Sequence, residues 1–370
     1  MKVPFNDLNL QHKAIRDEID NLFNSILESS AFIRGEYVEK FEEDFARASE
    51  RNFCVSCANG TDALYIAMKA LGIMDGDEVI APAHSWISTT STITQAGGKV
   101  VFCDTDDKTY TIDPKLIEDK ITPRTVGIIP VHLFGQPADM DPIIELAKKY
   151  NLWIIEDCAQ AHLAKYKDKL VGTFGDFGTY SFYPGKNLGA IGDAGAIVTN
   201  NKELSDKAAI IARHGGLKKG DHIIEGINSR MDGIQAGILS IKLRYLNEWT
   251  NLRRRAASIY GDFFSNNEFV KKPYEAEDRS HSFHLYVIQS ERRDELAKFL
   301  NQNEIGTVIN YRTALPFLEA YKRYEHSPSD FKNAYTNQSR ILSIPIFPDI
   351  NDDQIEFVSN KIRDFFYNLD

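Results

Sequence analysis

The stretch RTVGIIPVHLFGQPADMDPIIELAKKYNLWIIEDC, residues 124–158, decides the fold. It opens with an apolar run over 124–134 and continues with helically spaced apolar positions over 139–151. A second apolar run follows over 152–158. Runs that are apolar on both faces are typical of parallel strands covered by helices. The stretch therefore predicts a strand, a helix and a second strand parallel to the first.

The same alternation extends in both directions along the chain. It predicts an α/β fold with a mainly parallel sheet in a large domain over 1–250, and a smaller α/β domain over 251–370. Residues 233–264 predict one long helix or a helix pair that leaves the large domain. The remaining expected strands are 53–57, 77–83, 99–104, 281–289 and 306–311, and the remaining expected helices are 60–73, 85–97, 202–215, 292–303 and 351–366.

Composition narrows the class of protein. The 370 residues are 43% hydrophobic and 26% charged, as in ordinary globular proteins, and the net charge of −10 gives no reason to expect nucleic-acid binding. The first twenty residues are polar and no apolar run has the length of a membrane span, so we expect a cytoplasmic protein with no membrane partner. The Cys54–Cys57 pair has no second pair at zinc spacing, which favours buried thiols and no metal.

A small-residue turn follows the expected strand over 53–57. In ANGTDALYIAMKAL, residues 58–71, Gly60 and Thr61 stand where a helix begins. Free amides at a helix N-terminus attract phosphate, and glycine allows a close backbone approach. The alternative is an ordinary helix cap made by Thr61 or Asp62.

Two further features stand beside predicted strands. Glu156 and Asp157 end the strand over 152–158, the edge at which open α/β sheets bind ligands. A carboxylate there can hold a cationic heteroaromatic nitrogen, or it can cap a helix or form an ion pair. Trp86 follows the strand over 77–83 and could stack on a planar ring or pack in the core.

Lys186 is isolated among small and aromatic residues in SFYPGKNLGAIGDAGAIVTN, residues 181–200. A Walker A loop does not fit, because Tyr180 stands where its first glycine should be and Asn187 follows the lysine. The glycines at 189, 192 and 195 do not match G-x-G-x-x-G either. A phosphate cradle, a stacking aromatic, a carboxylate and a reactive lysine are together what pyridoxal phosphate requires.

The sequence resembles the DegT/DnrJ/EryC1/StrS nucleotide-sugar aminotransferases in six motifs that occur in the same order. These motifs are NGTDAL, HSWISTT, EDCAQAH, SFYPGKNLGAIGDAGAI, ARHGG and INSRMDGIQAGIL. The resemblance extends from VPFNDL to SIPIFPDI. It implies an aspartate-aminotransferase-like (type I) fold, and a homodimer with active sites at the subunit interface. It also implies these roles: Lys186 forms the Schiff base with pyridoxal phosphate, Asp157 pairs with the ring nitrogen, Trp86 stacks on the ring, Gln160 approaches the ring hydroxyl, Gly60, Thr61 and Ser181 bind phosphate, and Asn228 reaches over from the other subunit.

The resemblance further implies transfer of an amino group from L-glutamate to a nucleotide-linked keto-sugar. Relatives that dehydrate carry histidine at the position of Lys186, so lysine favours transamination. ALPFLEAY and Tyr183 look more like the branch acting on C3 of dTDP-3-keto-6-deoxyhexoses, although Asn310-Tyr311-Arg312 replaces a His-Tyr-Pro run. The expected sugar contacts are His162, Tyr183 and Tyr311. The alternatives are amination at C4 of a dTDP- or UDP-4-keto-sugar, a lyase or dehydratase, and a non-enzymatic regulatory homologue.

Overall fold

A computed structural model describes residues 1–218 and 220–367. Its core is a seven-stranded sheet in the order β1-β9-β8-β5-β4-β2-β3. Four neighbouring pairs are parallel, and only the two pairs that involve β9 are antiparallel. The mainly parallel sheet predicted from the sequence is confirmed. The strands are β1 (Phe53–Cys57), β2 (Glu78–Pro82), β3 (Lys99–Cys103), β4 (Thr125–Ile128), β5 (Trp153–Asp157), β8 (Phe177–Ser181) and β9 (Gly195–Thr199).

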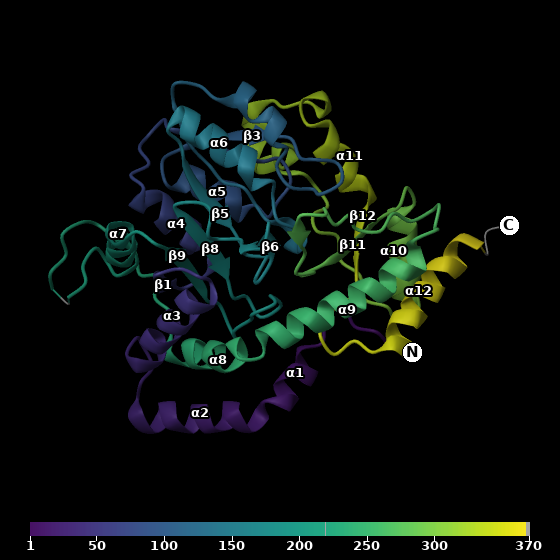
Figure 1. The fold of residues 1–370 in the computed structure, drawn as a ribbon, viewed down its shortest axis with the longest axis horizontal. Coiled ribbons are helices and arrows are strands. Elements are labelled where there is room, and N and C mark those ends of the chain that lie inside the picture. The colour runs from purple at the N-terminus through teal and green to yellow at the C-terminus, as the bar shows by residue number, and fades with distance from the viewer. Residues whose placement is uncertain (219, 368–370) are drawn as a thin grey trace.

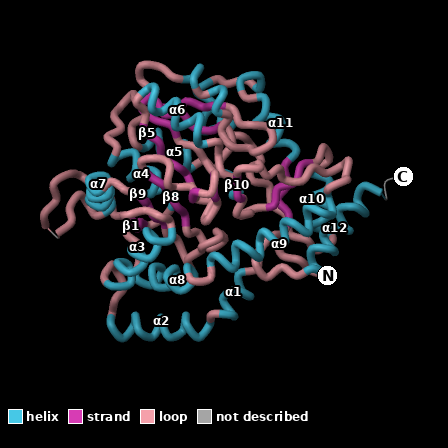
Figure 2. The backbone as a smooth tube through the Cα atoms, viewed as in Figure 1, coloured by secondary structure: helices cyan, strands magenta, loops and turns pink. Residues whose placement is uncertain are grey.

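Helices cover both faces of this sheet, as the apolar character of its strands requires (Figure 1). One face packs against α4 (Gly60–Ala70), α5 (Ser88–Gln95) and α7 (Lys202–Ala212). The other face packs against α3 (Glu36–Ala48), α6 (Met140–Tyr150) and α8 (Gly233–Leu243). The N-terminal helices α1 (Leu8–Ala14) and α2 (Arg16–Ser29) lie outside α8. Figure 2 shows the loop between α7 and α8 projecting away from the body of the molecule.

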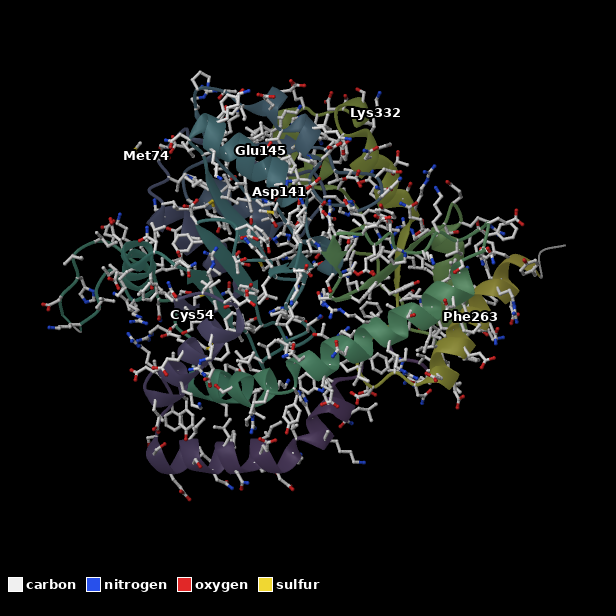
Figure 3. All side chains as sticks on the ribbon, viewed as in Figure 1. Cys54, Met74, Asp141, Glu145, Phe263 and Lys332 are labelled. Carbon is white, nitrogen blue, oxygen red and sulfur yellow. The ribbon has the colours of Figure 1, made fainter. Side chains whose placement is uncertain are left out.

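The stretch over 233–264 forms a helix pair, α8 and α9 (Leu246–Phe264). In Figure 3, Phe263 marks the far end of α9, where this helix packs beside α12 (Asp352–Tyr367). The C-terminal unit also contains α10 (Arg293–Gln302) and the antiparallel pair of β11 (Tyr286–Gln289) with β12 (Ile341–Ile344). Shorter elements are β6 (Lys165–Tyr166), β7 (Lys169–Leu170), β10 (Arg279–Ser280) and α11 (Lys332–Arg340).

The division into domains over 1–250 and 251–370 remains a proposal. The helix α9 is continuous through residue 250, so the two units are joined without a linker. Val3, from the start of the chain, is fully buried in the core of the C-terminal unit and forms a bridge with Ile305. The N-terminus accordingly lies beside α12 in Figure 1.

The strand expected over 306–311 is wrong, because only an isolated bridge joins Val308 to Ser343. The residues on either side bind elsewhere. The amide of Gly306 donates to the Val3 carbonyl, and the amide of Tyr311 donates to Nε2 of His84. These contacts limit the pairing with β12 to Val308, and the second of them joins the segment to the large domain.

No helix in the described ranges, 1–218 and 220–367, is long and apolar enough to cross a membrane.

Gly127 in β4 tests the packing of the sheet. A Cβ at this position would lie 2.2 Å from the indole ring of Trp153, so we expect Gly127→Ala to lower the free energy of unfolding by roughly 1–3 kcal/mol through overpacking. Gly261→Ala in α9 is the matched control. The nearest atom to its new Cβ is 3.9 Å away, and alanine should stabilise this helix by about 0.5–1 kcal/mol. Urea unfolding measures both, and equal stability of Gly127→Ala and the wild type would contradict the packing described.

Candidate functional site

A cavity of about 640 Å³ opens at the carboxyl ends of the parallel strands, where open α/β sheets bind ligands. Asp157 ends β5 and Ser181 ends β8, and both line the cavity. The structure brings most of the predicted site residues together here. Those lining the cavity are Gly60, Thr61, Trp86, Asp157, Gln160, Ser181, Tyr183, Lys186 and Tyr311.

The first turn of α4 forms one end of the cavity. The N-cap is Asn59, whose side chain accepts a hydrogen bond from the Asp62 amide at 2.8 Å, so the alternative of a cap by Thr61 or Asp62 is wrong. The amides of Gly60 and Thr61 belong to the first turn and have no acceptor within the helix. A Cβ on Gly60 would lie 2.6 Å from Cβ of Ser181, so glycine is required for these two segments to meet.

Asp157 is almost fully buried, and its carboxylate faces the cavity. One oxygen accepts the amide of Ala159 at 3.1 Å, and the other accepts the hydroxyl of Thr89 at 2.9 Å. Burial raises the pKa of Asp157, and the two hydrogen bonds and the charge of Lys186 oppose this shift. No Lys, Arg or His nitrogen in the described ranges lies within ion-pair distance of the carboxylate. The group is thus a buried acceptor that a cationic N–H would stabilise.

Glu156 is adjacent to Asp157, but its side chain turns to the opposite face of β5. Its two oxygens accept hydrogen bonds from His132 and from the amides of Gly172, Phe174 and Gly175 at 2.7–3.0 Å. Burial alone would raise the pKa of Glu156, but these donors hold it below its usual range. Glu156 is therefore a structural anchor, which leaves Asp157 as the carboxylate of the site.

Lys186 lies in the loop between β8 and β9, and its amide donates to the carbonyl of Tyr183 at 2.8 Å. Next to it, the Asn187 side chain donates to the Ser282 carbonyl at 3.0 Å and holds this loop against the C-terminal unit. Burial lowers the pKa of Lys186 to about 8, against the attraction of Asp157. Such an amine is neutral much more often than an exposed lysine at neutral pH, as a nucleophile must be.

Gln160, Tyr311 and Trp86 form a further part of the cavity wall. Gln160 accepts the Phe134 amide at its Oε1 atom, at 2.7 Å, which fixes the orientation of the carboxamide. Its Nε2 atom then donates to the hydroxyl of Tyr311 at 2.8 Å. Trp86 is 56% exposed, and its ring lies 5.4 Å from that of Tyr311. The indole is therefore available to a planar ligand and does not belong to the core.

The structure does not bring His162 or Asn228 to this cavity. His162 is fully buried between Tyr180 and Phe182 and lines no part of the cavity wall. Burial lowers its pKa to about 3, so it is a neutral residue of the core, and we do not retain it as a sugar contact. Asn228 is exposed in the segment before α8, outside the cavity formed by its own chain.

Sequence reasoning missed several residues of the cavity wall. Phe5 and Asn6 come from the N-terminal segment, for which no local pattern pointed to a site. Ser85 and Thr89, by contrast, are polar residues of the helix expected over 85–97, but in the structure this helix begins at Ser88 and Ser85 lies in the turn before it. The missed lining residues include Phe5, Asn6, Ser85, Thr89, Asp193 and His284.

The residues present fit pyridoxal phosphate. Gly60 lies directly against Ser181, and the two residues form a cradle with amide and hydroxyl donors for a phosphate. The Thr61 and Ser88 hydroxyls lie 2.8 Å apart at the same end of the cavity. Asp157 offers a buried carboxylate for a ring nitrogen, and Lys186 offers an amine for the carbonyl. This set of donors and acceptors matches the phosphate, nitrogen and aldehyde of that cofactor.

A buried group of His132, Glu156 and Cys158 has the proximity of a metal site but not the free ligands. The Glu156 oxygens accept four hydrogen bonds, and Nδ1 of His132 accepts the Ala138 amide at 3.0 Å. These lone pairs are already used within the protein.

Comparison with known proteins agrees with this geometry. Residues 13–363 match the model of the DegT/DnrJ/EryC1/StrS aminotransferase family. The chain is 41% identical to a Geobacillus stearothermophilus protein named pleiotropic regulatory protein, over 99% of both chains. It is 40% identical to dTDP-3-amino-3,6-dideoxy-alpha-D-galactopyranose transaminase of Aneurinibacillus thermoaerophilus, over 99% of this chain and 100% of the other.

The fold matches the crystal structure of Streptomyces venezuelae DesV in complex with a ketimine intermediate. The TM-score is 0.97 at 36% identity, and both chains are covered completely. The family match spans nearly the whole chain, and the cavity carries the groups that the family's cofactor needs. The chain belongs to the DegT/DnrJ/EryC1/StrS family of aminotransferases, which use pyridoxal phosphate.

Proposed function

We propose that this enzyme transfers the amino group of L-glutamate to C3 of a dTDP-linked 3-keto-6-deoxyhexose. The observation that carries the proposal is the convergence of Lys186, Asp157 and Trp86 on one cavity beside the first turn of α4. The names of the Aneurinibacillus and Streptomyces relatives support amination at C3 of a dTDP-linked sugar.

When bound, pyridoxal phosphate would supply an electron sink for negative charge developing at the carbon that carries the amino group. Lys186 is the residue that attaches to the cofactor and, once displaced, moves a proton at that carbon. Its lowered pKa, about 8, suits both roles, because the amine can give and take a proton near neutral pH.

The remaining cofactor contacts follow from the cavity wall. Asp157 would accept the N–H of the ring nitrogen and keep that nitrogen protonated. Trp86 would stack on the ring, and Gln160 would donate to the ring hydroxyl. Gly60, Thr61 and Ser181 would bind the phosphate, and Asn228 of a second copy would complete the site.

Tyr311 and Tyr183 are the proposed sugar contacts. Gln160 already donates to the Tyr311 hydroxyl, so the hydrogen of this hydroxyl is free to be donated into the cavity. Burial raises the pKa of Tyr311, which keeps the phenol protonated. Tyr183 is 60% exposed at the mouth of the cavity, where a bulky nucleotide-linked substrate must enter.

Amination at C4 of a dTDP- or UDP-4-keto-sugar is the main alternative, since no residue of the wall distinguishes the two carbons by itself. The name of the Geobacillus relative raises a regulatory role without catalysis. Such a role would not require Lys186, Asp157 and Gln160 to be kept together in one cavity. A cytoplasmic location remains a prediction of the sequence.

A panel of keto-sugars tests the proposed substrate. The enzyme loaded with pyridoxal phosphate is incubated with glutamate and a 3-keto or 4-keto sugar linked to dTDP or UDP. Mass spectrometry then detects the amino sugar. We expect kcat/KM for the dTDP-linked 3-keto-6-deoxyhexose to exceed that for the others by at least about tenfold, with Lys186→Ala inactive on all. A preference for a 4-keto sugar would favour the alternative, and no amino sugar from any substrate would contradict the proposal.

The shared site is tested by mixing two inactive variants, Lys186→Ala and Asn228→Ala. If each site takes Lys186 from one copy and Asn228 from the other, one of the two sites in a mixed dimer is intact. With random exchange of subunits we expect recovery of about a quarter of wild-type activity, because half the dimers are mixed and each has one working site. No recovery after refolding the variants together would contradict a site shared in this way, and each variant refolded alone is the control.

A further inference from the structure

Three buried side chains form a hydrogen-bonded chain that ends at Asp157. The hydroxyls of Ser85 and Thr89 lie 2.9 Å apart, and the Thr89 hydroxyl lies 2.9 Å from Oδ2 of Asp157. Ser85, Thr89 and Asp157 are 3%, 1% and 6% exposed, so bulk water does not compete for these contacts. The geometry is held by the backbone as well, because the Thr89 amide donates to the Trp86 carbonyl at 3.1 Å.

The direction of the two hydrogen bonds follows from counting the hydroxyl protons. An ionised carboxylate can only accept, so Thr89 must donate its single hydroxyl proton to Asp157. No proton is left on Thr89 for the contact with Ser85, so Ser85 is the donor there. Two hydroxyl dipoles therefore point the same way, toward the carboxylate, and each strengthens the other.

The arrangement also orients the carboxylate. Thr89 occupies one acceptor position on Oδ2, and the Ala159 amide occupies one on Oδ1. Each oxygen keeps a further acceptor position, and Asp157 lines the cavity. The two bonds fix rotation of the carboxylate, so that its remaining acceptor capacity is available to a ligand in the cavity.

Other ionisable groups near Asp157 do not replace Thr89. Lys186 and His132 favour the charged form of Asp157 by attraction, and Tyr311, a neutral phenol, lies nearby. Glu156 is bound by its own four donors on the opposite face of β5. Among the described residues, the Thr89 hydroxyl is the one side-chain donor in hydrogen-bond contact with Asp157.

We propose that Thr89, oriented by Ser85, is a positioning residue that holds Asp157 ionised and aimed at the ring nitrogen of the bound cofactor. This inference rests on the proposed role of Asp157. It adds a function for α5, which would fix the partner of the ring nitrogen through Thr89 and the face of the ring through Trp86 just before it.

Thr89→Val tests the inference, because valine keeps the shape of the side chain and removes the hydroxyl. Two quantities are measured by absorbance: the dissociation constant of pyridoxal phosphate, and the pH midpoint of the band of the bound cofactor. We expect the dissociation constant to rise about tenfold. Without the Thr89 bond, Asp157 takes the proton from the ring nitrogen. The nitrogen that joins the cofactor to Lys186 then becomes more basic, so the pH midpoint of the band rises by at least about half a pH unit.

Three further variants separate positioning from folding. Thr89→Ser keeps a hydroxyl and should restore both quantities, whereas Ser85→Ala should shift both in the direction of Thr89→Val by a smaller amount. Thr90→Val is the matched control: Thr90 is buried on the same helix, and its hydroxyl lies 2.7 Å from that of Tyr321, away from Asp157. It should leave both quantities unchanged even if it lowers the melting temperature.

The outcomes distinguish this inference from the proposed function. A wild-type protein that binds the cofactor, with Thr89→Val and Ser85→Ala equal to it in both quantities, would overturn the role of Thr89 and leave the proposed function intact. An equal shift in Thr90→Val would also overturn it, since the effect would then be general loss of packing. A wild-type protein that does not bind pyridoxal phosphate would overturn both.

Discussion

Adjacent residues of a β-strand face opposite sides of the sheet, and at the end of β5 this separates two buried carboxylates. Glu156 faces the interior and binds four donors, which come from the segment that follows β4 and from the turn before β8. Removing one partner of a buried, hydrogen-bonded charge costs about 3–5 kcal/mol, so these contacts hold three strand ends together. Asp157, one residue on, is thereby presented to the cavity from a rigid base.

The second support of the site is the segment over 84–89, which comprises the turn after β2 and the first two residues of α5. His84 accepts the Tyr311 amide at 3.0 Å, and Trp86 forms part of the cavity wall. Ser88 contacts Thr61 at the end proposed for phosphate, and Thr89 contacts Asp157 at the end proposed for the ring nitrogen. One short segment therefore contacts Thr61, Asp157 and Tyr311, at the two ends proposed for the cofactor and at the tyrosine proposed to bind sugar. Its residues are fixed by the helix that follows, which places the site on rigid elements.

Much of this could be predicted from the sequence, because the signals are local. Apolar runs and helical spacing located the strands and helices of the central sheet, and the lysine, the carboxylates and the small-residue turn are recognisable in short motifs. What could not be predicted depends on contacts between distant residues. The bridge from Val3 to Ile305 brings Phe5 and Asn6 into the cavity wall, and no local pattern reports such pairing.

The orientation of single side chains was equally out of reach. His162 stands within a motif of the site, but the backbone after β5 turns its ring into the core between two aromatic residues. The segment over 306–311 has the composition of a strand, yet only Val308 pairs with β12, because the amides at the two ends of the segment bind Val3 and His84. In both cases tertiary packing overrides a local preference.

The most direct test of the central claim is the absorbance spectrum of the protein with pyridoxal phosphate, recorded before and after addition of glutamate. We expect a band of bound cofactor that glutamate removes as 2-oxoglutarate forms, and that Lys186→Ala cannot form in the same way. A band that glutamate leaves unchanged would contradict glutamate as the donor. The absence of any band would contradict the assignment of Lys186, Asp157 and the first turn of α4 to a cofactor site.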